Sequence, residues 1–269
     1  MEFHNFSKEE IAHFHKALAC ISPNELDTTR LPDNLAIVQT ETYQADCDQF
    51  IDPERSIGTE DIDAAVIFPN NRTASPKILL NKEKIVDLSY IHTLSKQLVI
   101  VYNFHLFFCD YGHMYTFTQE KMIEKYYYEF LLWVKFQAKK ISTRAYVIRM
   151  WHKINGEAPP PDNHYFFAGI TVNKDALNRK LHNLEQSDHV AAARENVWDC
   201  LGALAAYLGE LAFYQNTPDP GQVDEDFPGI EIFRWFGEEN TLKLYDLLLR
   251  LPIFGQARLA AIAPLCGGS

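Results

Sequence analysis

HTLSKQLVIVY, from His92 to Tyr102, lies within the most apolar part of the chain and comes shortly after KILLN, residues 77–81. KILLN is a short apolar run with proline and asparagine at its borders, which is typical of a β-strand. The run from Ile85 to Phe108 has the pattern of an amphipathic helix. We therefore predict a strand, placed at the edge of a sheet, that leads into a long helix.

The rest of the chain before residue 157 combines strands and helices. IAHFHKALACI (Ile11–Ile21) predicts a short helix, and LAIVQTETY (Leu35–Tyr43) and AAVIF (Ala64–Phe68) predict strands. The run from Thr118 to Lys153 predicts one or two further helices, with its first residue as the N-cap.

The segment APPPDN (Ala158–Asn163) divides the chain, because three successive prolines cannot continue a helix. After it the pattern is helical, with apolar residues at three- and four-residue spacing from Asp188 to Tyr214. GIEIFRWFG and EENTLKLYDLLLRL form a further helical pair that is split by Gly237. We predict a helix-rich α+β protein with a small N-terminal sheet, an α/β domain over residues 1–157 and a helical domain over residues 164–269.

The composition describes an ordered globular protein. Of the 269 residues, 47% are hydrophobic and 13% aromatic, which is enough apolar material for a sizeable core. The net charge of −11 repels phosphate and anionic lipid, so we expect neither a nucleic-acid partner nor a membrane partner. The longest apolar run, 98–108, is much shorter than the roughly 20 residues that span a bilayer.

The cysteines and the first residues predict a cytoplasmic protein. The five cysteines are far apart and include no C-x-x-C pair: Cys20, Cys47, Cys109, Cys200 and Cys266. An odd number of scattered thiols fits a reducing compartment better than a disulfide framework. MEFHNFSKEE, residues 1–10, has no basic segment followed by an apolar run, so we expect no secretion signal.

One segment is strongly basic. Between Phe130 and Gly156 there are six basic residues and no acidic one, which leaves −17 on the rest of the chain when six positive charges are subtracted from −11. Interleaved aromatic residues would suit contact with nucleic acid or an acidic partner. Because the long-range field is negative, we favour a solvated helix face that lies against the acidic remainder.

The aromatic block YYYEFLLWVKF, from Tyr126 to Phe136, would surround a helix almost completely. Such a helix is expected in the middle of a fold, with its tyrosine hydroxyls reaching polar partners. A ligand pocket lined by these rings is the alternative, and core packing is the favoured interpretation.

The succession of KILLN and YIHTLSKQLVIVYNF (Tyr90–Phe104) resembles minimal zincin-like metallopeptidases, including the repressor-cleaving type of bacterial mobile elements. In that family the helix after the strand carries H-E-x-x-H. Its two histidines hold Zn²⁺ and its glutamate acts as general base on the bound water. The resemblance covers about residues 63–144 and implies a zincin-like domain of bacterial or mobile-element origin.

The aligned helix lacks this motif. The alignment places Lys96 and Ile100 at the two histidine positions and Gln97 at the glutamate position. EFLLWVKFQAKK (129–140) resembles the ligand-bearing W-x-E-F-x-A pattern of a later helix, with Lys135 at the ligand position. Lysine at neutral pH has no free lone pair, isoleucine has no ligating atom, and glutamine cannot take up the proton. The resemblance thus implies a vestigial site that holds no metal.

Two other interpretations of this region remain open. An ordinary core helix would carry Lys96 and Gln97 on its solvated face. An active hydrolase would need a site of another kind, and its first candidates as metal ligands are His92, His105, His113 and Glu124. No G-x-S-x-G, phosphate-binding glycine loop or G-x-G-x-x-G occurs in the sequence, so no nucleophile and no cofactor are assigned.

The leading expectation is a non-catalytic binding or regulatory protein on a degenerate metallopeptidase scaffold, that is, a pseudoenzyme with no catalytic residue, metal or cofactor. The second is an active hydrolase with an unrecognised site near the three histidines named above. The third is a helical structural or interaction protein. A protein is the expected partner.

Overall fold

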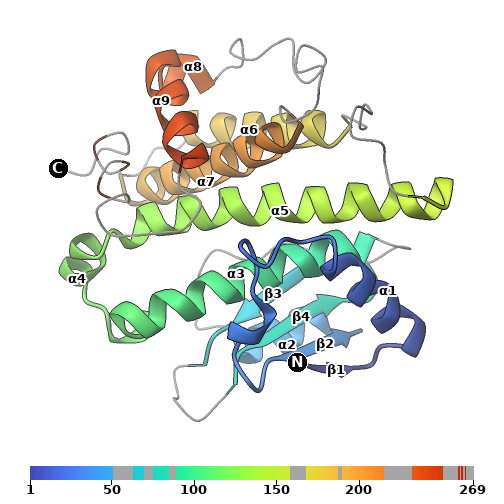
Figure 1. Ribbon diagram of the computed structural model, residues 1–269. Helices are drawn as coiled ribbons and strands as arrows, with labels where there is room; N and C mark the ends of the chain where they lie inside the picture. The colour runs from blue at the N-terminus through green and yellow to red at the C-terminus, as the bar shows by residue number, and fades with distance from the viewer. Residues whose placement is uncertain are drawn as a thin grey trace. The chain divides into compact units, whose positions relative to one another are not determined.

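The computed structural model describes residues 1–50, 63–69, 75–84, 89–157, 168–186, 190–214 and 232–250, together with residues 260, 262 and 264. In these parts the chain has a helix-rich α+β fold with one small mixed sheet near the N-terminus (Figure 1). The predicted fold class is confirmed.

The chain forms two compact units. The first comprises Met1–Phe117 and Ile141–Pro159, and the second comprises Thr118–Lys140 and Pro160–Ser269. The long helix α5 (Tyr127–Asn155) therefore contributes its first half to the second unit and its second half to the first. The proline segment 158–163 lies outside the described residues, so the predicted domain boundary there stays a prediction.

The sheet of the first unit has the strand order β1-β2-β4-β3, from the strands β1 (Glu2–His4), β2 (Ala36–Thr40), β3 (Ala64–Ile67) and β4 (Lys77–Asn81). Strands β1, β2 and β4 are parallel, and β3 is antiparallel to β4. The prediction that KILLN is an edge strand is wrong, because β4 pairs with β2 on one side and β3 on the other. Its three central residues are buried, as a strand covered on both faces requires.

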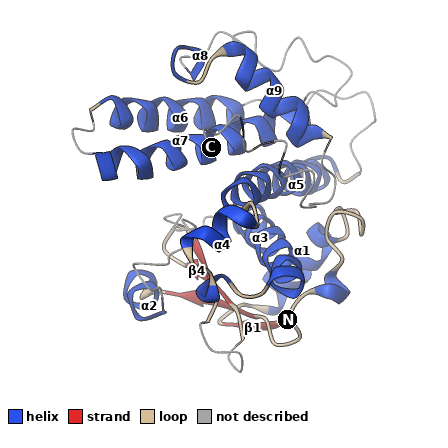
Figure 2. Cartoon of the chain, turned by 90° about the vertical axis from the view of Figure 1, so that its left-hand side faces the viewer, coloured by secondary structure: helices blue, strands red, loops and turns tan. Residues whose placement is uncertain are grey.

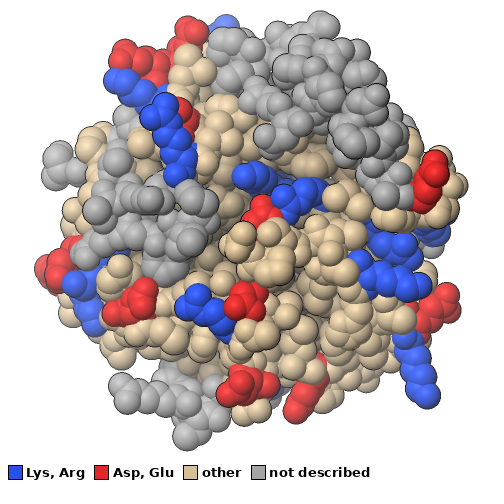
Figure 3. Space-filling model, in the orientation of Figure 1, with Lys and Arg blue, Asp and Glu red and all other residues tan. Residues whose placement is uncertain are grey.

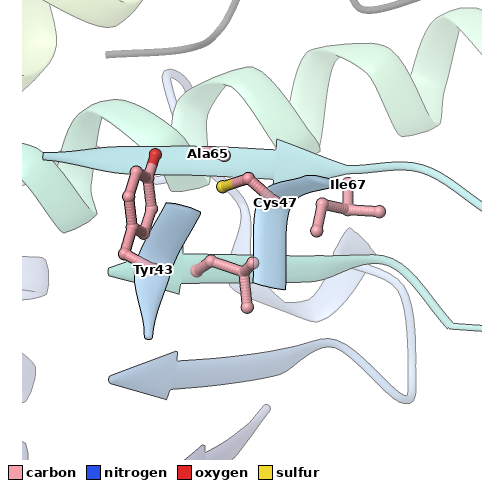
Figure 4. Packing of buried hydrophobic residues seen from close by; sticks show 5 residues of the cluster. Tyr43, Cys47, Ala65 and Ile67 are labelled. Atoms are coloured by element: carbon pink, nitrogen blue, oxygen red, sulfur yellow. The ribbon is translucent and has the colours of Figure 1, made fainter. Parts of the chain in front are cut away.

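Helices cover both faces of the sheet. The helix α2 (Tyr43–Phe50) places Tyr43 and Cys47 on one face, against Ala65, Ile67 and Leu79 (Figure 4). The helix α3 (Ser89–Tyr111) contacts β3 and β4, and it lies on the opposite side of the sheet from α2 (Figure 2). Successive side chains of a strand point to opposite faces. Because helices cover both faces of the sheet, every residue of β3 is buried.

Local signals set the helix starts in this part of the chain. The helix α1 (Lys8–Leu18), which contacts α3, begins with a capping box in which Ser7 and Glu10 each accept a hydrogen bond from the other's backbone N–H. Thr118 accepts from the N–H of Lys121 at the start of α4 (Gln119–Glu124), which confirms the predicted N-cap. Two short 3-10 helices are η1 (Thr28–Arg30) and η2 (Met114–Thr116).

The second unit is helical. The helices α6 (Ala168–Glu185) and α7 (Val190–Tyr214) lie side by side (Figures 1 and 2). The helix α9 (Glu238–Leu249) follows the short α8 (Ile232–Trp235) and contacts α7. Gly237, which the sequence predicts as the break in this pair, has φ +89°, where a side chain would be strained. Position 209 of α7 also requires glycine, because a β-carbon there would clash with the backbone carbonyl of Phe136 in α5.

Candidate functional site

Three of the predicted vestigial positions lie on α3 in the first unit. Lys96 is partly buried, Gln97 is 0% exposed and Ile100 is 6% exposed. The interpretation of Lys96 and Gln97 as a solvated helix face is therefore wrong for Gln97. This helix is nearly apolar all round and lies over the sheet, so its polar residues are drawn into the interior with it.

Within the part of the chain that the structure describes, the buried Gln97 amide makes no hydrogen bond through either its Nε2 or its Oε1 atom. The hydroxyl of Ser95, also fully buried, has no hydrogen-bond partner among these residues either. Buried polar atoms are almost always hydrogen-bonded, and leaving one unpaired costs about 1–3 kcal/mol. The general-base position of the proposed alignment is thus occupied by a neutral, inaccessible and destabilising group.

The fourth position, Lys135, belongs to the part of α5 in the second unit. Its side chain passes over Gly202 of α7, where a β-carbon would come within 2.5 Å of its Nζ atom. One turn later, Lys139 Nζ lies 3.9 Å from Glu210 Oε2, also on α7. Lys135 is therefore part of the α5–α7 packing within the second unit. That it shares a site with Lys96 stays a prediction.

His92 lies beside the second half of α5 within the first unit. Its Nε2 atom is 3.3 Å from Ser142 Oγ, and its ring meets the Tyr146 ring edge to face at 5.8 Å between centroids. Ser142 is fully buried. A serine next to a histidine is the start of a nucleophile and base pair, but a substrate has no access to a serine without exposed surface.

The other candidate ligands have separate surroundings. His105 Nε2 lies 3.9 Å from Cys109 Sγ, one turn further along α3. His113 caps η2, and Glu124 forms an exposed ion pair with Lys125 at 2.6 Å. Burial lowers the pKa of both His105 and His113. Among the residues that the structure describes, no group of three or more His, Cys, Asp or Glu side chains could hold a metal ion.

Two side chains of the basic segment lie against acidic residues, as predicted, but five of its six basic residues are partly buried rather than solvated. Arg144 forms a two-pronged ion pair with Glu25, Lys139 faces Glu210, and burial lowers the pKa of Lys140. Lys153 is the one of the six basic residues that is exposed. On the face drawn in Figure 3, basic and acidic side chains are interspersed rather than gathered by sign. Arg144 and Lys139 are thus each paired with an acid on a neighbouring element of their own unit.

The aromatic block behaves as core, as predicted. Tyr127, Phe130, Trp133 and Phe136 are all buried along the first half of α5. Tyr126 precedes the helix with φ +53°, at the sharp turn that separates α4 from α5.

Two buried carboxyl groups of the second unit were not predicted from the sequence. Glu210 on α7 is 3% exposed, and its Oε2 atom makes no hydrogen bond to any residue that the structure describes. Glu129 on α5 is buried as well, and burial raises the pKa of both groups. A signal was present for Glu210, since it is the only charged residue in LGALAAYLGELAFY (Leu201–Tyr214). A lone acid in an otherwise uncharged stretch of helix is expected to be buried with its apolar neighbours.

Within the described residues, no helix has both the length and the apolar character that a membrane crossing needs. The four cysteines that can be assessed, Cys20, Cys47, Cys109 and Cys200, are free thiols. Burial raises the pKa of the Cys200 thiol to about 11.

The chain matches no protein-family model, and comparisons with curated proteins and with solved structures give no significant match.

Proposed function

We propose that this protein is a non-catalytic binding or regulatory protein, built on a degenerate zincin-like metallopeptidase scaffold. One observation carries the proposal. Gln97, at the position that the resemblance assigns to the general base, is completely buried in α3 and cannot take up a proton. A general base must lie within hydrogen-bond reach of the water that it activates.

The neighbouring positions support the same proposal. Ile100, at the second histidine position, is a core residue, and Lys96 carries a positive charge that repels a metal cation. Lys135, at the third ligand position, packs over Gly202. Each of the four positions thus has a side chain with a structural role or a charge that opposes metal binding.

The proposed partner is another protein in the cytoplasm. Free thiols on four described cysteines support a reducing compartment. The net charge of −11 and the engagement of Arg144 and Lys139 with carboxylates oppose binding of a polyanion. A bacterial or mobile-element source is proposed on the resemblance alone.

An active hydrolase is the second candidate, and the contact between His92 and Ser142 is the observation in its favour. A peptide-library cleavage assay, read by mass spectrometry, separates the two proposals. The full chain is incubated with the library after chelator treatment and again after addition of Zn²⁺. We expect no new peptide termini in either condition. Cleavage that survives the chelator and disappears in His92→Gln or Ser142→Ala would establish a serine hydrolase instead. Zinc-dependent cleavage that disappears in His92→Gln, His105→Gln or His113→Gln would establish a metallohydrolase.

A further inference from the structure

His113 is held between two aromatic rings where α3 ends and η2 begins. Its imidazole stacks on Phe108 of α3, with 4.3 Å between centroids and 27° between planes. Its other face stacks on Tyr115 of η2 at 4.8 Å and 13°. The ring is thus enclosed in a three-layer stack of residues only seven positions apart.

The same ring caps the N-terminus of the short helix η2. His113 Nδ1 accepts a hydrogen bond from the backbone N–H of Tyr115 at 3.4 Å. The backbone oxygen of His113 accepts further bonds from the N–H and the hydroxyl of Thr116, at 2.9 Å and 2.7 Å. An imidazole can accept at Nδ1 only when that nitrogen is unprotonated, because both ring nitrogens of the cation are donors.

The stack joins η2 to the sheet. The Tyr115 hydroxyl donates to the backbone oxygen of Phe68, which directly follows β3, at 2.7 Å. The Phe68 ring packs on Phe104 and Phe108 of α3, at 5.1 Å and 5.2 Å between centroids. Two residues after Tyr115, at Phe117, the chain leaves the first unit. The stack therefore anchors the segment through which the chain leaves the first unit.

The electrostatic surroundings favour the neutral ring. Burial lowers the pKa of His113 from its ordinary value of 6.5, and no charged residue in the described part of the chain contributes to this shift. The titratable group that faces it from η2 is the Tyr115 phenol, whose proton is used in the bond to Phe68. From α3 it faces the uncharged Phe108 ring. Nothing in the stack compensates a positive charge on His113.

We propose that His113 is an acid-sensitive latch, whose protonation releases Tyr115 from Phe68 and opens the segment Gly112–Phe117. A proton on Nδ1 turns the acceptor of the cap into a donor that faces the Tyr115 N–H. The partly buried cation then leaves the stack for water. This inference does not rest on the proposed function.

Hydrogen–deuterium exchange of the full chain tests the latch. Because the closed segment has a lower His113 pKa than the open one, opening takes up one proton as the pH falls below 6.5. After correction for intrinsic exchange rates, we expect exchange in 112–117 to rise by up to about fivefold between pH 6.5 and 5.5. In His113→Asn the rise should vanish, because asparagine can cap η2 and does not titrate. A wild-type rate that is independent of pH, or an equal rise in His113→Asn, would overturn the proposal.

Two further variants and one spectrum keep the test decisive. Tyr115→Phe lacks the bond to Phe68, so exchange should be faster at every pH while the slope is kept. His105→Gln should leave the slope unchanged, since His105 lies outside the stack. At pH 7.5 the ¹⁵N shifts of His113 should show an unprotonated Nδ1. A protonated Nδ1 at that pH would contradict the latch even if His113→Asn fails to fold.

Discussion

His92 of α3 and Ser142 of α5 are in contact within the first unit, with 3.3 Å between Nε2 and Oγ. The contact joins residues 50 positions apart, and Ser142 is fully buried while the histidine ring is only partly so. We interpret it as a link between the two helices rather than as a catalytic pair. The next residue, Thr143, is also buried, but its hydroxyl makes no hydrogen bond with the described residues.

These two neighbours form a matched pair of substitutions. Ser142→Ala should lower the free energy of unfolding by about 1 kcal/mol, because it removes a hydrogen bond. Thr143→Val, which removes a buried hydroxyl without a partner, should leave it unchanged or raise it. Urea denaturation measures both. A fluorophosphonate probe should not label Ser142, and labelling that depends on His92 would contradict the structural role.

The glycines of α7 give a second matched pair. Gly209→Ala should destabilise the protein by about 1–3 kcal/mol, because the new methyl group meets the rigid backbone of Phe136 and the helices must separate. Gly202→Ala meets the flexible end of Lys135, which can move aside, and alanine gains about 1 kcal/mol of helix propensity. The unfolding temperature of Gly209→Ala should therefore be well below that of Gly202→Ala. The reverse order would contradict the close packing of α5 and α7.

The buried Glu210 predicts a pH-dependent stability difference. Burial raises its pKa above the ordinary 4.5, and Lys139 at 3.9 Å opposes this only in part. A raised folded-state pKa means that the stability from this group is complete below about pH 4.5 and is lost as the pH rises through the folded-state value. Glu210→Gln keeps the neutral form at every pH. Its free energy of unfolding should thus increase relative to wild type from pH 4.5 upward, in urea titrations at each pH.

An exposed glutamate provides the control for that prediction. Glu239 forms an ion pair with Lys243 that lowers its pKa, so Glu239→Gln should show no gain relative to wild type as the pH rises. A Glu210→Gln difference that is constant with pH would show that the carboxyl group is ionised equally in the folded and unfolded chains.

Gln97 tests the interior of α3. Gln97→Met replaces an unpaired buried amide by an apolar side chain of similar length, so it should leave the stability unchanged or raise it. Gln97→Glu would bury a carboxylate in the same place and should cost several kcal/mol at neutral pH. The denaturant midpoints of the two variants, compared with that of the wild type, measure these stability changes. A stable Gln97→Glu protein would show that this position has solvent or a cation nearby, as a working active site would.

The sequence predicted those elements whose signals are local. Three such predictions depend only on residues next to one another in the sequence, and the structure confirms all three: the break at Gly237, the N-cap Thr118 and the strand at 77–81. The strand β1 and the helix α2 were missed. Three residues form β1 only because β2 pairs with them, and α2 is a polar segment of which Tyr43 and Cys47 pack against the sheet.

The candidate site was less predictable than the fold. The residue types at 96, 97 and 100 are read directly from the sequence, but the burial of Gln97 depends on packing between elements distant in the chain. The same holds for Arg144, whose partner Glu25 is 119 residues away and leaves the guanidinium only partly exposed. Spacing along one helix does not show which of its faces will be covered.

The metal content of the native protein tests the proposed function most directly. The full chain, produced in zinc-supplemented medium and purified without chelator, is measured by elemental analysis, and its unfolding temperature is compared before and after chelator treatment. A metal that binds only the folded state would raise that temperature. We predict far less than one Zn per chain and an unchanged unfolding temperature. About one Zn per chain, together with a lower unfolding temperature after its removal, would contradict the degenerate site.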